Sequence, residues 1–252
     1  MPALSGSTIL ALAVAAFFAG TVDAIAGGGG LITLPALLTA GLPTTIAIGT
    51  NKGGSMWGSG AASLAFWRAG RVDRKQAAFA FPLAVCGSLI GANLVLGISK
   101  DALRPVVIAM LVFAAVVMVV RKPKRTDDAD VPRRRPVAAL LAFVIGMYDG
   151  FFGPGTGTFL IVGFVTLCGR SLVNASADAK IVNFGSNLAA VAIFAWRGTI
   201  AWEVALPMAA GQLLGGLVGT RLALKGGARV VRAMVLVVSG ALIVKLIVDL
   251  AI

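Results

Sequence analysis

Two lysines, Lys52 and Lys180, lie inside long apolar segments rather than in the polar connections between them. At 1.5 Å per helical residue, each lies roughly 9 to 12 Å from the end of its segment. A lysine at such a depth in a membrane costs about 2.5 to 3.5 kcal/mol on insertion scales, so it needs a polar cavity or partner. Hydroxyl and amide side chains accompany both lysines at helical spacing, namely Asn51, Ser55 and Ser59 near Lys52, and Asn183 and Asn187 near Lys180. This combination predicts a binding site for a small oxyanion.

Three acidic residues, Asp23, Asp149 and Asp178, lie in or beside the same segments. Any of them could instead hold a lysine in a structural ion pair, and the Ser and Asn side chains could serve helix packing. Because the sequence contains no histidine, these carboxylates and the lysines are also the candidates for coupling transport to protons.

Glycine clusters occur at residues 27–30 and 153–157, one in each half of the chain. A chain break at glycine followed by a new helix would direct the positive end of a helix dipole into the protein, where anions bind. Gly28, Gly29, Gly155 and Thr156 are therefore added to the candidate substrate site. Close helix packing is the alternative interpretation of these clusters.

The elements that carry these residues are membrane helices. Hydrophobic residues make up 58% of the 252-residue chain, charged residues only 13%, and the mean hydropathy is +0.95. A soluble domain of this size needs more surface charge, and the apolar runs are continuous rather than alternating, which excludes a β-barrel. The net charge of +12 comes from residues between the runs, as is typical of cytoplasmic loops and not of nucleic-acid binding.

The chain is a tandem of two related halves. Asp23 is repeated as Asp149, 126 positions later, and Lys52 as Lys180. We expect a first membrane repeat at residues 1–120, a basic linker at 121–136 and a second membrane repeat at 137–252. The predicted segments are 7–22, 28–40, 44–67, 77–97 and 103–120 in the first repeat, and 137–150, 156–169, 174–196, 204–224 and 230–250 in the second.

The second segment of each repeat is too short to cross a membrane as a straight helix, so we expect it to be tilted, broken or partly unwound. If all segments cross, the repeats are inverted and 16 loop Lys and Arg lie in the cytoplasm against 3 outside; a parallel arrangement gives 12 and 7. The charge distribution favours inversion. The predicted fold class is therefore an all-α polytopic membrane protein with two inverted repeats of about five segments each. It should lie in the inner cell membrane with the linker 121–136 in the cytoplasm.

Two stretches of the sequence resemble a known family. The run "GTVDAIAGGGGLITLPALLTAGLPTTIAIGTNK" at residues 20–52 and the run "GMYDGFFGPGTGTFL" at residues 146–160 are similar to the sulfite exporter TauE/SafE family of membrane permeases. The resemblance extends over nearly the whole chain. It implies a secondary transporter of sulfite, sulfonates or related organosulfur anions.

Together these observations predict an exporter of a small sulfur-containing anion that works by alternating access, with one repeat moving against the other around a central site. A carrier of another small organic anion is the first alternative. A transmembrane thiol relay through Cys86 and Cys168 belongs to a different class, although the two cysteines are not equivalent in the repeats. No metal, cofactor or enzymatic activity is predicted. Membrane lipid is an expected partner, and the GxxxG faces in the fourth segments could serve internal packing or a homo-oligomer.

Overall fold

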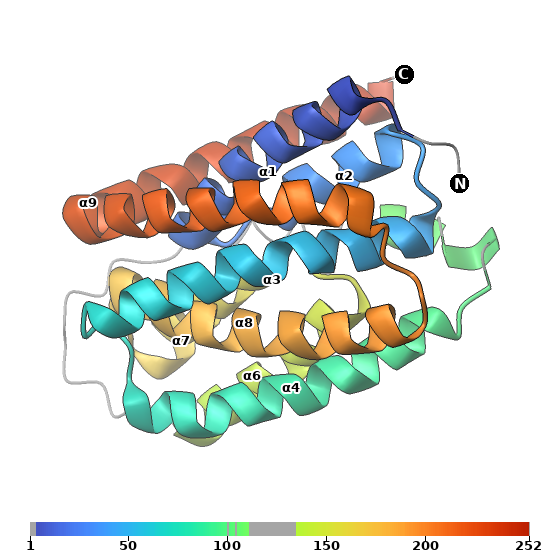
Figure 1. Cartoon of the computed structure of the whole chain (residues 1–252). Helices are drawn as coiled ribbons and strands as arrows, with labels where there is room; N and C mark the ends of the chain where they lie inside the picture. Colours follow the sequence, from blue (N-terminus) through green and yellow to red (C-terminus); the bar gives the residue numbers. More distant parts are fainter. Residues whose placement is uncertain (1–3, 100, 104, 111–134, 252) are drawn as a thin grey trace.

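The computed structural model describes residues 4–99, 101–103, 105–110 and 135–251, and all regular secondary structure in these ranges is helical (Figure 1). The first half contains α1 (Gly6–Ala26), α2 (Gly30–Thr39), α3 (Thr44–Arg68) and α4 (Arg74–Leu96), followed by helical residues at 101–103 and 105–110. The second half contains α6 (Arg135–Phe151), α7 (Thr156–Cys168), α8 (Leu172–Trp196) and α9 (Trp202–Ala251). The predicted linker 121–136 lies outside the described residues except at 135 and 136, and the fifth segment, 103–120, is described only in part.

The helix boundaries follow local capping signals. The Ser5 hydroxyl accepts a hydrogen bond from the Thr8 N–H at the start of α1, and the Asp73 carboxylate accepts hydrogen bonds from the Lys75 and Gln76 N–H groups at the start of α4. Gly27 ends α1 with a left-handed φ of 82°, which only glycine adopts without strain. α9 contains non-helical backbone at Gly227, so it consists of two helices across a kink, near the boundary predicted between segments 204–224 and 230–250.

Three described helices are long and apolar enough to cross a membrane, namely α1, α4 and α8. α2 and α7 are apolar but contain only 10 and 13 residues, which correspond to about 15 and 20 Å of helix against a hydrocarbon core of about 30 Å. The prediction that the second segment of each half is short is confirmed. Large apolar side chains are exposed on several helices, including Leu10 at 66% and Leu140 at 63%, as expected of a surface in contact with lipid.

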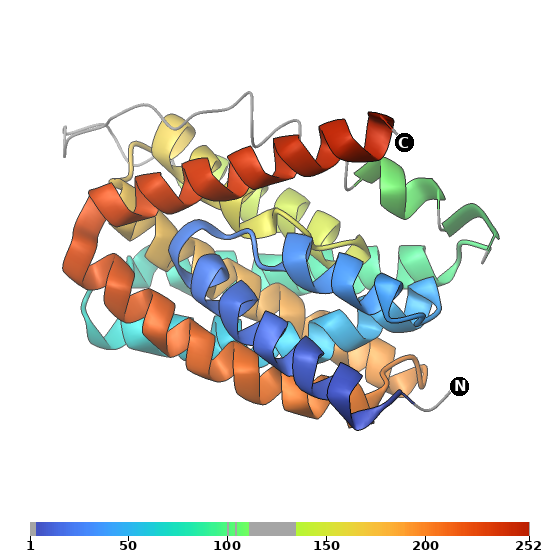
Figure 2. The ribbon, with the colours of Figure 1, turned by 90° about the horizontal axis from the view of Figure 1, so that it is seen from above.

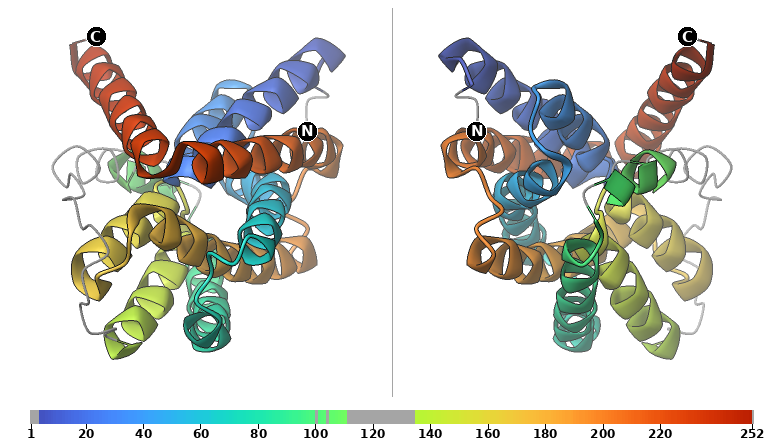
Figure 3. Two further views of the ribbon diagram at one scale, coloured as in Figure 1. Left: turned by 90° about the vertical axis from the view of Figure 1, so that its left-hand side faces the viewer. Right: turned by 90° about the vertical axis from the view of Figure 1, so that its right-hand side faces the viewer.

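The helices pack in two groups, each of which takes three helices from one half of the chain and one helix from the other half. α1, α2, α3 and α9 form a first bundle, and α4, α6, α7 and α8 form a second bundle. The most extensive contacts join α1 to α9 and α4 to α6, so the first helix of each half packs on the fourth helix of the other half (Figure 3). The two bundles meet mainly where α3 packs on α8.

Glycines make these exchanged contacts close. A Cβ atom on Gly91 of α4 would lie 1.9 Å from the Met147 carbonyl oxygen of α6, and one on Gly215 of α9 would lie 2.1 Å from the Phe17 carbonyl oxygen of α1. Gly87, Gly211 and Gly219 make equivalent contacts. The GxxxG faces of the fourth segments therefore serve packing within the chain.

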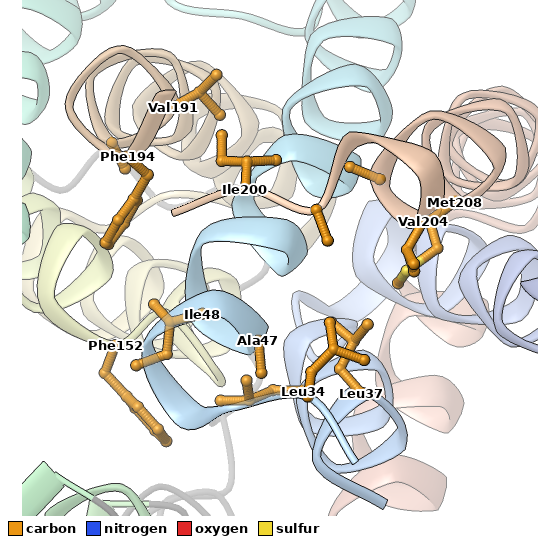
Figure 4. Packing of buried hydrophobic residues seen from close by; sticks show 14 of the residues in the cluster. Leu34, Leu37, Ala47, Ile48, Phe152, Val191, Phe194, Ile200, Val204 and Met208 are labelled. Carbon is orange, nitrogen blue, oxygen red and sulfur yellow. The ribbon is translucent and has the colours of Figure 1, made fainter. Parts of the chain in front are cut away.

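Two apolar cores lie where the bundles meet, and each contains residues of both bundles. The first combines side chains of α2, α3 and α8 with residues of the α6–α7 and α8–α9 connections and the start of α9 (Figure 4), and these include Leu34, Leu37, Ala47, Ile48, Phe152, Val191, Phe194, Ile200, Val204 and Met208. The second lies among α4, α6, α7 and α8 around Phe164 and also contains Ile25 of α1, Phe66 of α3 and Ala223 of α9. These cores pack around α3 and α8, which carry the two lysines.

Most of the described basic residues other than the two buried lysines gather at one end of the molecule. This basic end contains the α3–α4 connection, the start of α6, the α7–α8 connection and the kink of α9 (Figures 1 and 3). Its described cations are Arg68, Arg71, Arg74, Lys75, Arg135, Arg170, Arg221, Lys225 and Arg229. The opposite end contains the start of α1, the α2–α3 connection and the α8–α9 connection with Arg197 (Figure 2).

Candidate functional site

Both buried lysines form ion pairs that cross from one bundle to the other. Lys52 Nζ on α3 lies 2.6 Å from Asp149 Oδ1 on α6, and both side chains are 2% exposed. Lys180 Nζ on α8 lies 2.8 Å from Asp23 Oδ2 on α1, where the lysine is fully buried and the aspartate is 18% exposed. Since Asp23 and Asp149, and likewise Lys52 and Lys180, occupy equivalent positions in the two halves, each half supplies the acid for the lysine of the other.

Asp149 is surrounded by hydrogen-bond donors. Besides Lys52, the Thr156 hydroxyl donates to Oδ1 at 2.9 Å and the Ser186 hydroxyl donates to Oδ2. A buried carboxylate is tolerated only when its oxygens are paired in this way. The structure therefore supplies donors to both oxygens of Asp149 at the bundle interface.

Amide side chains continue the network from Lys52 along α8. The lysine ammonium also donates to Asn187 Oδ1 at 3.1 Å. The Asn187 amide nitrogen donates to Asn183 Oδ1 at 2.7 Å and to the Ser59 hydroxyl at 3.3 Å. Ser59 from the neighbourhood of Lys52 and both asparagines from the neighbourhood of Lys180 are thus joined in one network with Lys52.

The glycine breaks meet in the interior. The Thr158 N–H donates to the Gly27 carbonyl oxygen at 3.3 Å, and the Thr158 hydroxyl donates to the Ala26 carbonyl oxygen at 2.6 Å. A Cβ atom on Gly27 would lie 2.1 Å from the Gly157 carbonyl carbon, so close packing explains this part of the clusters.

The helix that follows each break begins beside the aspartate of the same half. The Gly29 N–H, just before α2, donates to Asp23 Oδ1 at 3.3 Å, and the first residue of α7, Thr156, donates its hydroxyl to Asp149. Carboxylates are stabilised at helix N-termini for the same reason as other anions. Each aspartate therefore stands where a bound anion would gain the same stabilisation.

A small cavity of about 20 Å³ lies at this interface. Its walls come from both bundles, with Asp23, Gly29, Gly30, Asn51, Lys52, Ser55 and Gln212 on the first bundle and Asp149, Gly153, Asn183 and Asn187 on the second. This volume holds about one water molecule. The cavity is therefore too small for a four-atom oxyanion.

The comparisons with known proteins agree with the resemblance seen in the sequence. The family described as "Sulfite exporter TauE/SafE" matches residues 12–246. The chain belongs to the TauE/SafE family. It is 41% identical over 240 residues to "Probable membrane transporter protein ORF9" of Sinorhizobium sp, covering 94% of this chain and 92% of that protein. It is 38% identical over 237 residues to "Probable membrane transporter protein YfcA" of Escherichia coli strain K12, covering 93% and 87% of the two chains.

A third relative is "Probable membrane transporter protein" of Haemophilus influenzae, which is 38% identical over 235 residues. The match covers 92% of each of the two chains. No solved structure matches the chain significantly. Together with the apolar helices, TauE/SafE membership identifies a membrane transporter.

The structure brings together some of the predicted site residues of this TauE/SafE protein and separates others. Gly29, Asn51, Lys52, Ser55, Asn183 and Asn187 line the cavity. Lys180, Ser59, Gly28, Gly155 and Thr156 lie outside its lining, and Lys180 is connected to it through Asp23. Each lysine is bonded to one of the aspartates that the sequence offered as ion-pair partners, Lys52 to Asp149 and Lys180 to Asp23.

Asp178 occupies a different place from the other two acids. Its Oδ2 lies 2.7 Å from Arg170 Nε, and its Oδ1 accepts a hydrogen bond from the Asp73 N–H at 2.9 Å. Asp178 therefore ties α8 to the start of α4 near the basic end and does not line the cavity. The equivalent residue in the first half, Thr50, accepts a hydrogen bond from the Ala201 N–H at the start of α9.

Sequence reasoning missed several polar residues of the site. Gln212 lines the cavity and its amide lies 3.5 Å from the Ser55 hydroxyl, while Ser186 donates to Asp149. The signal for Gln212 was a lone amide within the glycine-rich fourth segment. Cys86 is exposed on α4 and Cys168 is buried on α7, which gives the thiol-relay alternative no common site.

Proposed function

We propose that this TauE/SafE protein is a secondary transporter that exports a small sulfur-containing anion, such as sulfite or an organosulfonate, by alternating access. The observation that carries the proposal is the pair of buried Lys–Asp ion pairs that cross the bundle interface beside a polar cavity. The choice of a sulfur anion rests on the family description. Carriage of another small organic anion is the alternative outcome of the experiment below.

Charge balance supplies the mechanism. An anion that enters the cavity can take the place of Asp149 beside Lys52, because it offers the same negative charge to the ammonium. The start of α7 and the donors of Thr156 and Ser186 already stabilise a negative group at this position. Binding of the anion and pairing within the protein thus compete for the same lysine.

Release of an aspartate from its lysine provides a route to proton coupling. A buried carboxylate that loses its counter-charge is stabilised by taking up a proton. Asp149 is the first candidate, since it is the more deeply buried partner, and Asp23 is the second. Each anion would then move together with a proton.

The moving units we propose are the two exchanged bundles rather than the two halves of the sequence. α3 and α8 form most of the contact between the bundles and carry both lysines. Separation at one end and then at the other would open the cavity alternately to the two sides of the membrane. The inverted arrangement of the repeats remains part of this proposal.

We further propose an orientation in the inner cell membrane with the basic end and the linker 121–136 in the cytoplasm. The charge distribution supports it, because the described cations gather at the basic end while the opposite end has Arg197. Loops rich in Lys and Arg face the cytoplasm in such proteins.

Flux measurements in reconstituted vesicles test the function. We expect Lys52→Ala and Lys180→Ala each to reduce sulfite flux at least tenfold, while Arg197→Ala, which removes an exposed cation far from the cavity, retains wild-type flux. Unchanged flux in both lysine variants would refute the site. Flux of simple carboxylates in preference to sulfite and sulfonates would support the alternative substrate class.

A further inference from the structure

A basic pocket and an apolar groove adjoin each other at the basic end, outside the proposed transport site. The pocket has a volume of about 390 Å³ and is lined by the α3–α4 connection, the first turn of α4 and the start of α8. Its charged lining residues are Arg71, Asp73, Arg74, Lys75 and Arg170. These four cations face one carboxylate in the lining and a second, Asp178, which is bonded to Arg170, so the pocket keeps a net positive charge that attracts an anion.

The apolar groove has a volume of about 460 Å³ and lies between α3 on one side and α4 and α8 on the other. Leu64, Ala78, Phe81 and Phe184 line it, together with Trp67. Arg74 lines both the groove and the basic pocket, so the two spaces adjoin at this residue. The groove also follows the seam between the first and second bundles.

Arg74 and Trp67 mark the level at which the environment changes from polar to apolar. The Arg74 guanidinium carbon lies 5.5 Å from the centre of the Trp67 ring, which is a cation–π distance. Tryptophan and arginine are the residues that anchor membrane proteins at the headgroup level. A ligand at this position has its charged part beside Arg74 and its apolar part beside Trp67.

We infer that an anionic phospholipid binds here, with its phosphate in the basic pocket and one acyl chain in the groove between α3 and α4. Charge complementarity selects an anionic headgroup, and the apolar walls of the groove select a hydrocarbon chain over a soluble phosphate. The acyl chain would then lie between the two bundles along their seam. In addition, Arg170 of the pocket is bonded to Asp178, two residues before Lys180 on α8, so the headgroup adjoins the helix that carries one of the buried lysines.

Lipid retention by the purified full-length protein provides the test. Native mass spectrometry in detergent would compare binding of phosphatidylglycerol with that of phosphatidylcholine. We expect wild type to prefer phosphatidylglycerol by about tenfold or more, because each cation near a lipid headgroup contributes measurably. The triple variant R71Q/R74Q/K75Q should lose this preference.

A matched control removes the same charge at the same end. The variant R221Q/K225Q/R229Q loses three exposed cations outside the pocket and should keep the preference for phosphatidylglycerol. Equal loss in both triple variants would mean that general surface charge attracts the lipid, and would overturn the specific site. Absence of any preference in wild type would overturn it as well.

Two further comparisons separate the lipid from a free phosphate. Ala78→Trp fills the groove without touching the basic pocket and should weaken phosphatidylglycerol binding, whereas Leu140→Trp on exposed α6 surface should not. Inorganic phosphate should fail to displace the lipid at equal concentration. Full displacement by phosphate, or binding unaffected by Ala78→Trp, would identify a headgroup-only anion site and reject the acyl-chain groove. None of these measurements depends on the transported substrate.

Discussion

Lys52 Nζ lies 2.6 Å from Asp149 Oδ1, and this ion pair joins α3 of the first bundle to α6 of the second. The two residues come from different halves of the sequence, and the pair is repeated between Lys180 and Asp23. The two ion pairs therefore connect the same two bundles twice, with the acid and the base exchanged.

The stability of the Lys52–Asp149 pair depends on both partners being present. Lys52→Met leaves a carboxylate buried without its counter-charge, and breaking such a pair costs about 3 to 5 kcal/mol. The double variant Lys52→Met/Asp149→Leu replaces the pair by apolar side chains and should regain most of the lost thermal stability in detergent without regaining transport. A double variant less stable than Lys52→Met would contradict this view of the pair.

The donors to Asp149 should contribute to stability as well. Ser186→Ala removes a hydroxyl that donates to the buried carboxylate and should lower the free energy of unfolding by about 1 to 3 kcal/mol. Thr166→Ala removes an exposed hydroxyl that bonds only its own helix backbone at Val162 and serves as the control. Thermal unfolding of both variants checks the difference, and equal melting temperatures would argue against a buried charge at Asp149.

The contact between α4 and α6 tolerates only glycine at position 91. A Cβ atom there would overlap the Met147 carbonyl oxygen at 1.9 Å, so Gly91→Ala must push the helices apart at a cost of about 1 to 3 kcal/mol or more. Gly6→Ala, at a site with open space, should be neutral. Because the contact lies within the chain, the oligomeric state should not change in either variant; a selective loss of oligomer in Gly91→Ala would point instead to a contact between chains.

A disulfide between the bundles should stop transport. Cysteines at Gly30 and Pro154 can link α2 of the first bundle to the α6–α7 connection of the second, because a Cβ on Gly30 lies 3.1 Å from Pro154 Cα. In a background without Cys86 and Cys168, oxidation should abolish flux and reduction should restore it. A second pair at Leu141 and Gly163 links α6 to α7 within one bundle and should leave flux intact; full flux in the oxidised Gly30/Pro154 variant would show that the bundles do not move as proposed.

Thiol labelling tests the orientation of the two ends. In the same cysteine-free background, Lys225→Cys at the basic end should react with an impermeant reagent only from the cytoplasmic side, and Arg197→Cys at the opposite end only from outside. Both positions are exposed, so accessibility does not limit the reaction. The reversed pattern would contradict the proposed orientation, and reaction of both cysteines from one side would contradict the course of α9.

The sequence predicted the helices and their breaks well, because apolar runs, glycines and prolines act locally. It also singled out Lys52, Lys180, Asp23 and Asp149, because charged residues in apolar segments are conspicuous. Which aspartate pairs with which lysine was not predictable, because a helix that is apolar on all sides carries no signal for which neighbour it faces. The exchange of α4 and α9 between the halves, and the place of Gln212 beside Ser55, depend on such tertiary choices. For the same reason Asp178 was grouped with the other acids although it holds Arg170 near the basic end.

The exchanged packing of α4 and α9 also has a consequence for biosynthesis. α4 is synthesised before α6, so its glycine face has no partner until the second half begins to be made. In the same way, α1 has no partner until α9 is made. Neither half can complete a bundle alone. Insertion of the early helices must therefore precede their assembly, and a chain that stops before α9 would present the quality-control proteases of the membrane with two unfinished bundles instead of one finished domain.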